Sequence, residues 1–181
     1  MGRLTESSLL NVKNKSRAIT ARFTAPAAGA DGVLVAQGGA FGGWTLYLRH
    51  GRPAYCYNLF GMTRFHVEGA DVVPAGDHQL RVEFAYDGCG FGKGGTATLY
   101  LDGELVGQGR VDATVPMIFS VDETADVGQD TGTMVSDRYT SEGSRFTGTI
   151  EWVEIDIDGA AADEDHLISP EECLRLAMAR Q

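Results

Sequence analysis

The chain has 181 residues, of which 43% are hydrophobic and 22% charged, so it is long enough for one well-cored domain and short for two. Its formal net charge of −10 argues against nucleic acid and anionic membranes as partners, because both would repel an acidic surface. No apolar stretch approaches the roughly 18 residues of a membrane helix, and the N-terminus has no signal-peptide pattern. The sequence assigns no cellular compartment.

Apolar and polar residues alternate in short runs separated by many of the 24 glycines, a pattern typical of strands joined by tight turns. Residues 1–14 have no clean period, and we expect ten short strands after them. In the last strand, Ile150 and Trp152 lie out of register with Val153, and a β-bulge near Trp152 would resolve this change of phase. The predicted strands are Arg17–Phe23, Val33–Gln37, Trp44–Arg49, Arg52–Leu59, Thr63–Glu68, Leu80–Tyr86, Thr96–Leu101, Leu105–Val111, Pro116–Val121 and Thr147–Ile157.

No helical period separates these strands, which argues against a fold with crossover helices between parallel strands. Residues 1–158 are therefore expected to form an all-β antiparallel β-sandwich or jelly roll. Residues 159–181 differ, because an acidic stretch precedes Ser169, which suits a helix N-cap, and Glu172 completes a capping box. We expect an acidic linker and a short C-terminal helix that packs on the same domain.

Gly90, Gly92 and Gly95 match the G-x-G-x-x-G spacing of dinucleotide-binding loops. Such a loop needs a helix N-terminus directly after it to hold the phosphate, whereas the segments predicted on both sides here are strands. We therefore interpret the spacing as a glycine-rich β-hairpin loop.

Aromatic residues on the predicted strands are candidates for a ligand-binding or interface surface. They are Trp44, Tyr47, Tyr55, Tyr57 and Tyr100. A sandwich face with aromatic rings can stack sugars, but such rings also fill sandwich cores. Core or inter-domain packing is favoured over a carbohydrate platform, because large apolar patches more often mark interfaces.

An acidic loop, Asp122–Thr133, is a candidate calcium site through Asp126 and Asp130. Calcium takes six to eight oxygen ligands, which carboxylates, hydroxyls and backbone carbonyls of this loop can supply. The loop lacks the EF-hand spacing and its closing glutamate. The favoured alternative is that Asp and Thr side chains stabilise the loop through hydrogen bonds to nearby backbone amides. No other cofactor is expected.

Nine short blocks of the sequence form a recognisable series. They are Asn11–Ser16, Ala18–Ala21, Gly32–Gly39, Phe41–Trp44, Phe84–Gly88, Gly92–Gly95, Asp126–Gly128, Asp130–Thr133 and Phe146–Ile150. In this order and spacing they resemble the C-terminal region of large bacterial arylsulfatases. The resemblance spans roughly Arg3 to Ile157 and implies a concanavalin-like or laminin-G-like jelly roll.

Sulfatases use a formylglycine made from the cysteine or serine of a C-x-P/A-x-R motif, and none of Cys56, Cys89 and Cys173 begins such a motif. The resemblance therefore implies a non-catalytic accessory domain that docks on a sulfatase catalytic domain, in the same chain or separately encoded. The alternative is a lectin-like carbohydrate-binding module. We also expect that the chain can form a homodimer through a face containing several of the tyrosines named above.

Overall fold

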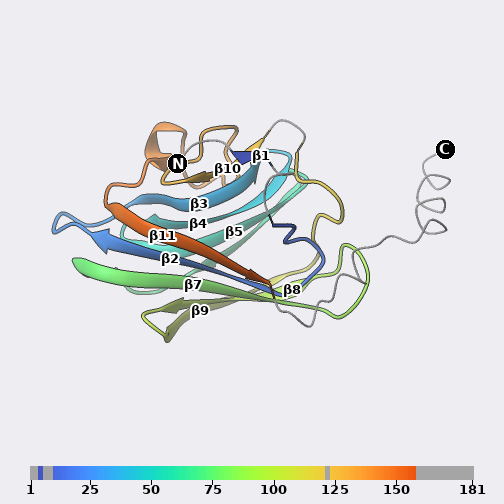
Figure 1. Cartoon of the computed structure of the whole chain (residues 1–181), viewed down its shortest axis with the longest axis horizontal. Coiled ribbons are helices and arrows are strands. Elements are labelled where there is room, and N and C mark those ends of the chain that lie inside the picture. The colour runs from blue at the N-terminus through green and yellow to red at the C-terminus, as the bar shows by residue number, and fades with distance from the viewer. Residues whose placement is uncertain (1–3, 6–9, 121–122, 158–181) are drawn as a thin grey trace.

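The computed structural model describes residues 4–5, 10–120 and 123–157, which form two packed antiparallel sheets (Figure 1). One sheet has the strand order β1-β10-β3-β4-β5-β6, and the other has the order β11-β2-β7-β8-β9. The predicted all-β sandwich is confirmed, whereas the helix predicted within 159–181 lies outside the described residues. The strands are β1 Leu4–Thr5, β2 Arg17–Ala25, β3 Gly32–Gly39, β4 Gly42–Arg49, β5 Arg52–Leu59, β6 Thr63–Glu68, β7 Gly76–Tyr86, β8 Gly95–Leu101, β9 Glu104–Val111, β10 Thr124–Val127 and β11 Thr149–Ile157.

The main core lies between the two sheets, and strand β7 illustrates how the sequence builds it. Leu80, Val82 and Phe84 are buried in this core, whereas Arg81 and Glu83 between them point away from it. Burial of one large apolar side chain contributes about 1.5–3 kcal/mol. A register slip by one residue would expose this whole set, so the alternation fixes which face of the strand points inward.

Two features near the chain's C-terminal half test the strand predictions most sharply. The bulge in β11 is confirmed, because its pairing with β2 shifts register between Ile150 and Trp152. The strand predicted at Pro116–Val121 is wrong where the structure describes it, since residues 116–120 form no strand. Phe119 is buried there and packs edge-on against the ring of Tyr57, so the apolar residues close one end of the core.

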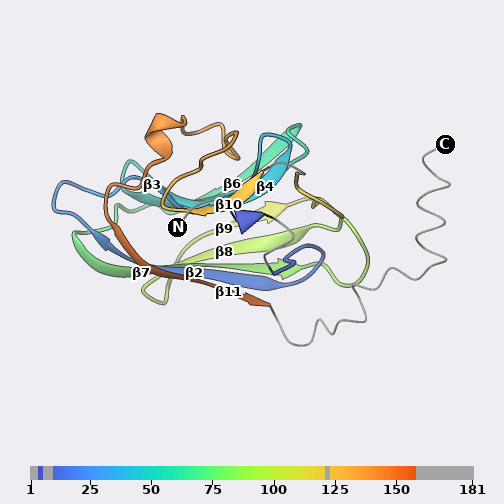
Figure 2. The ribbon, with the colours of Figure 1, turned by 45° about the horizontal axis from the view of Figure 1, so that its top comes forward.

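A long segment, 128–148, covers the outer face of the six-stranded sheet (Figure 2). Val135 from this segment packs in a second small core, with Tyr139 against it. The sheet residues of this second core are Val33, Ala36, Tyr47, Ala54 and Cys56.

The five-stranded sheet has no comparable cover within the described residues. Outward-facing residues such as Glu83, Arg110 and Glu154 are exposed. Its outer face is therefore the open sheet face of the sandwich. In the described ranges, no helix is long and apolar enough to cross a membrane.

Candidate functional site

Four of the five aromatic candidates lie inside the protein. Trp44, Tyr55 and Tyr57 belong to the core between the sheets, and Tyr47 belongs to the second core under segment 128–148. Each is at most 1% exposed, so these four side chains do not form an outer surface, which corrects the expectation of a ligand or partner face. Strands β3, β4 and β5 are buried on both faces. The alternation of apolar and polar residues along a strand cannot show that another segment of the chain covers its outer face.

The polar groups of two buried aromatics, Trp44 and Tyr57, have hydrogen-bond partners. The Trp44 Nε1 donates to Gln37 Oε1 at 2.9 Å, and the Tyr57 Oη accepts from the backbone N of Val115 at 2.8 Å. Burial raises the pKa of Tyr47 to about 12, which keeps its phenol neutral. These bonds and this burial are typical of core packing, the favoured alternative for these residues.

Tyr100 is the aromatic candidate that lies on the open sheet face. It pairs with Arg81 across β7 and β8, so it points to the same side as that arginine, and it is partly exposed. Together with Gln79 and Glu83 it lines a hollow of about 330 Å³ that reaches the β8–β9 turn at Gly103.

A second hollow of about 270 Å³ adjoins the first, because Arg81 and Glu83 line both. Ala18, Ala85 and Asp156 are among its other lining residues. Small alanine side chains between longer polar ones leave this depression in the sheet surface. We call the two hollows together the sheet groove.

Arg81 occupies the middle of the sheet groove and connects three strands. Its Nε lies 2.8 Å from Glu83 Oε1, its Nη1 donates to Thr20 Oγ1 at 3.0 Å, and the same nitrogen lies 3.6 Å from Asp156 Oδ2. A guanidinium held by several partners keeps a fixed orientation, and each carboxylate keeps further lone pairs for a ligand. The arrangement offers donors and acceptors side by side on a rigid sheet.

Trp152 lies toward the β11 edge of the same face and is 42% exposed. It pairs with Arg22 on β2, whose Nε lies 3.5 Å from Glu151 Oε2. Because β11, β2, β7 and β8 are consecutive in the sheet, Trp152 and Tyr100 are three strand spacings apart. Trp152 is in the row of Arg22 and Gln79, two residues along the strands from the row of Arg81 and Tyr100, so the two positions are roughly 16 Å apart. Tyr100 lines the groove, whereas Trp152 lies outside both hollows on the same face.

Sequence reasoning missed Trp152, Arg81, Glu83 and Asp156 as site residues. The available signal was the polar set that alternates with the buried residues of β7 and β11. That signal marks an outward face but does not reveal which strands are neighbours.

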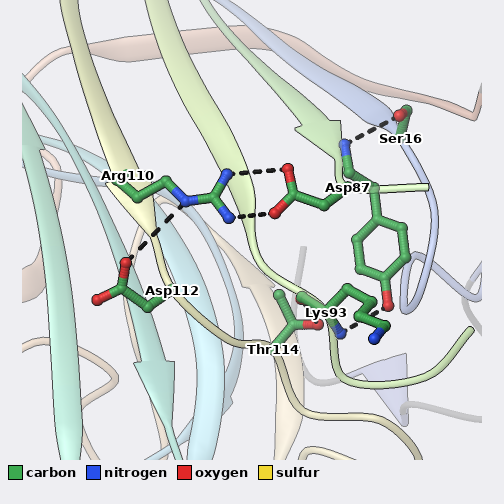
Figure 3. A network of polar contacts seen from close by, with 7 residues as sticks. Ser16, Asp87, Lys93, Arg110, Asp112 and Thr114 are labelled. Carbon is green, nitrogen blue, oxygen red and sulfur yellow. Dashed lines mark hydrogen bonds and ion pairs between the residues drawn. The ribbon is translucent and has the colours of Figure 1, made fainter.

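The glycine-rich loop between β7 and β8 is held in place at one end of the open face (Figure 3). The two terminal nitrogens of Arg110 on β9 donate hydrogen bonds to the two carboxylate oxygens of Asp87, and this pairing lowers the pKa of Asp87. Inside the loop, the Lys93 backbone N donates to Tyr86 Oη at 2.8 Å, and Thr114 Oγ1 donates to Lys93 O at 2.7 Å. Strands flank the loop on both sides, which confirms the hairpin interpretation.

The acidic loop has its two carboxylates engaged by neighbouring donors. Asp126 Oδ2 accepts from Thr131 Oγ1 at 2.6 Å, and Asp130 Oδ2 accepts from Tyr139 Oη at 2.7 Å and from Val135 N at 3.0 Å. Burial raises the pKa of Asp130 to about 6 despite these hydrogen bonds. Within the described ranges, no group of three or more His, Cys, Asp or Glu residues is placed to hold a metal ion. The local geometry matches the loop-bonding alternative, and calcium binding stays a prediction.

No family model matches the chain, and no curated protein matches it. Among solved structures, the LG1-3 region of the laminin alpha2 chain matches with a TM-score of 0.57 and 18% identity over 82% of this chain and 29% of that chain. The CBM40 domain of Ruminococcus gnavus IT-sialidase matches with a TM-score of 0.53 and 18% identity, covering 84% of this chain and 82% of that chain.

The same CBM40 domain bound to alpha2,3 sialyllactose matches with a TM-score of 0.52 and 16% identity over 80% of this chain and 78% of that chain. The chain spans 29% of the laminin alpha2 chain and 37% of a mouse laminin alpha1 chain with domains LG4-5. No family or curated relative supports the resemblance to arylsulfatases. At this low identity the likenesses establish the fold alone, and that fold is the concanavalin-like, laminin-G-like antiparallel β-sandwich.

Proposed function

We propose that this chain is a non-catalytic carbohydrate-binding module that takes its ligand in the sheet groove. The observation that carries the proposal is the continuous groove across the open face, with Arg81 at its centre, the partly exposed ring of Tyr100 in its lining and the exposed ring of Trp152 on the same face. The likeness to sugar-binding sandwich domains supports the same class of function, since one of those neighbours is a sialidase CBM40 bound to sialyllactose.

The chemistry of the groove suits sugar hydroxyls. A hydroxyl both donates and accepts, so it binds best where donors and acceptors alternate. Arg81 supplies donors, Glu83 and Asp156 supply acceptors, and Gln79 supplies both. Charged partners make hydrogen bonds roughly twice as strong as neutral ones.

The two aromatic rings on this face suit the apolar faces of sugar rings. Tyr100 and Trp152 present aromatic surface on the same side of the sheet as Arg81. Their separation of roughly 16 Å would let an extended oligosaccharide contact both rings and the polar centre together.

The charge around the groove favours an uncharged glycan. Carboxylates outnumber guanidiniums there: the acidic residues are Glu83, Glu151, Glu154 and Asp156, and the basic residues are Arg22, Arg81 and the buried Arg17. An anionic sugar would meet this excess of negative charge in a chain whose net charge is −10. We therefore propose neutral oligosaccharides as the ligand class.

Calorimetric titration with a panel of neutral oligosaccharides tests this function. We expect Arg81→Ala and Tyr100→Ala each to weaken binding by about 10-fold or more, because each removes a central contact. Arg52→Ala is a matched control, since Arg52 is exposed on β5 of the other sheet. Absence of binding to every glycan, or equal binding by the wild type and both groove variants, would remove the proposal.

A second candidate is an accessory domain that docks on a sulfatase catalytic domain. The nine sequence blocks between Asn11 and Ile150 favour it. The genomic sequence around this reading frame tests it: an adjoining sulfatase catalytic region would support docking, and its absence would leave the glycan-binding proposal alone.

A further inference from the structure

Three loops at one end of the sandwich expose large apolar side chains to solvent. Phe41 lies between β3 and β4, Phe60 and Met62 lie between β5 and β6, and Met117 and Ile118 lie between β9 and β10. Their exposed fractions are 72%, 45%, 78%, 48% and 51%, respectively. We call these five residues the apolar tip. Their loops lie at the right-hand end of the sandwich in Figure 1.

The first two loops are fastened to each other. Asn58 Nδ2 donates to Gly39 O at 2.8 Å and to Ala40 O at 3.1 Å, and Asn58 Oδ1 accepts from Gly61 N at 2.9 Å. The approach is close enough that a Cβ on Gly61 would lie 2.5 Å from Ala40 O. The loops with Phe41 and Met62 therefore lie side by side.

The third loop is anchored to the same end. A Cβ on Gly42 would lie 3.3 Å from both Phe119 O and the Val115 side chain. Asn14 Nδ2 also donates to Pro116 O at 2.6 Å. Met117 and Ile118 are thus exposed on a loop whose backbone is held in place by these contacts.

The parts of the three loops that carry the tip residues contain no charged residue, whereas Asp112, Asp122 and Glu123 lie at the two ends of the loop between β9 and β10. Segments 38–43, 59–63 and 113–121 hold neither Asp, Glu, Lys nor Arg, although 22% of the chain is charged and its net charge is −10. Two acidic molecules repel least where their contact surfaces are uncharged. A contact made by these uncharged segments places no charged side chain of the segments themselves against the second copy.

We propose that two copies of this chain pair through the apolar tip. Each of the five side chains offers on the order of 100–150 Å² of exposed surface, so two apposed tips would bury on the order of 1,200 Å². That area is at the lower end for stable protein interfaces, and the resulting dimer is a weak, concentration-dependent one. A two-fold axis lets the same patch serve both partners.

The proposed dimer does not depend on which ligand the sheet groove binds, and it would give each particle two grooves. A tip-to-tip dimer leaves the open sheet face of each copy outside the contact, because the tip loops are not part of the sheet groove. Two grooves on one particle would raise the apparent affinity for a glycan-coated surface without any new contact.

Sedimentation across a concentration series and a salt series, from about 50 mM to about 500 mM, tests the pairing. We expect the wild type to dimerise more tightly as salt is added, because salt screens the repulsion between two chains of charge −10. The double variant Phe41→Ser/Met62→Ser should raise the dimer dissociation constant by about 10-fold or more. Val72→Ser is the matched control, because Val72 is 54% exposed in the loop between β6 and β7, outside the tip.

A wild type that stays monomeric at every concentration and salt would overturn the proposal. Equal weakening by Val72→Ser and by the tip variant would overturn it as well, because the contact would then not be specific to the tip. A monomeric wild type that sediments with neutral phosphatidylcholine vesicles through Phe41 and Met62 would assign the tip to a membrane surface instead. Circular dichroism of each variant checks that it is folded.

Discussion

Asp130→Asn is expected to flatten the pH dependence of stability. Asp130 lies within segment 128–148 and is 1% exposed, and burial raises the pKa of its carboxyl from the usual 3.8 to about 6. Between these values the folded chain binds a proton that the unfolded chain has lost. The free energy of unfolding therefore falls as the pH rises through this window, and the contribution is complete below about pH 4 and absent above about pH 6.

The size of the effect follows from the pKa difference, which corresponds to about 3 kcal/mol. Asparagine has nearly the same shape, and its carbonyl oxygen can still accept from Tyr139 Oη and Val135 N, but it does not titrate. Wild type and Asp130→Asn should therefore differ in stability by an amount that changes by up to about 3 kcal/mol between pH 4 and pH 7.

Urea unfolding of both proteins at several pH values between about 4 and 7 measures this difference. Groups unaffected by the substitution cancel when the two curves are subtracted. A stability difference that stays constant across the pH range would refute the reasoning that burial of Asp130 controls this titration.

Three further predictions concern the core, a strand glycine and the acidic loop. Leu80→Ala should lower the free energy of unfolding by about 2–5 kcal/mol in urea melts, because Leu80 is fully buried between the sheets. Gly38→Ala should cost about 1–3 kcal/mol in the same assay, since Gly38 has a φ of +91° and a Cβ there would lie 2.1 Å from Gly42 O. Thermal melts with calcium and with chelator should superimpose, because neighbouring donors already occupy Asp126 and Asp130; a shift of the wild type that Asp130→Asn abolishes would establish a calcium site instead.

The sequence predicts the five-stranded sheet well because one of its faces is open. Strand β7 has buried Leu80 and Val82 alternating with outward Arg81, and β11 shows its bulge at Trp152 as a change of phase. In each case water on one side and core on the other produce the period of two.

The same method fails in the six-stranded sheet because segment 128–148 covers its outer face. Both alternating sets of β4 and β5 are buried, so Tyr47 and Tyr55 give equally apolar signals although they lie in different cores. Segment 128–148 contains one short 3-10 turn and no strand, and its packing is therefore not visible as a period.

The groove depends on strand order, which no local pattern encodes. Arg81 and Asp156 lie on β7 and β11, and β2 from the start of the chain lies between those strands. The strand pairs β11–β2 and β2–β7, which bring Arg81 and Asp156 together, join segments that are far apart in the sequence. The alternation of polar residues in one strand therefore predicts which of its faces points outward, but not which strands lie beside it.

The two tryptophans provide the most direct test of the glycan-binding groove. Trp44 is fully buried in the core, whereas Trp152 is 42% exposed on the open face, so their indole NH signals in a ¹H–¹⁵N correlation spectrum report on different places. Titration with a neutral oligosaccharide should move the Trp152 signal along a saturable curve and leave the Trp44 signal in place, and Arg81→Ala should weaken that curve. Saturable binding that leaves the Trp152 signal unmoved would contradict the account, because the ligand would then lie elsewhere on the molecule.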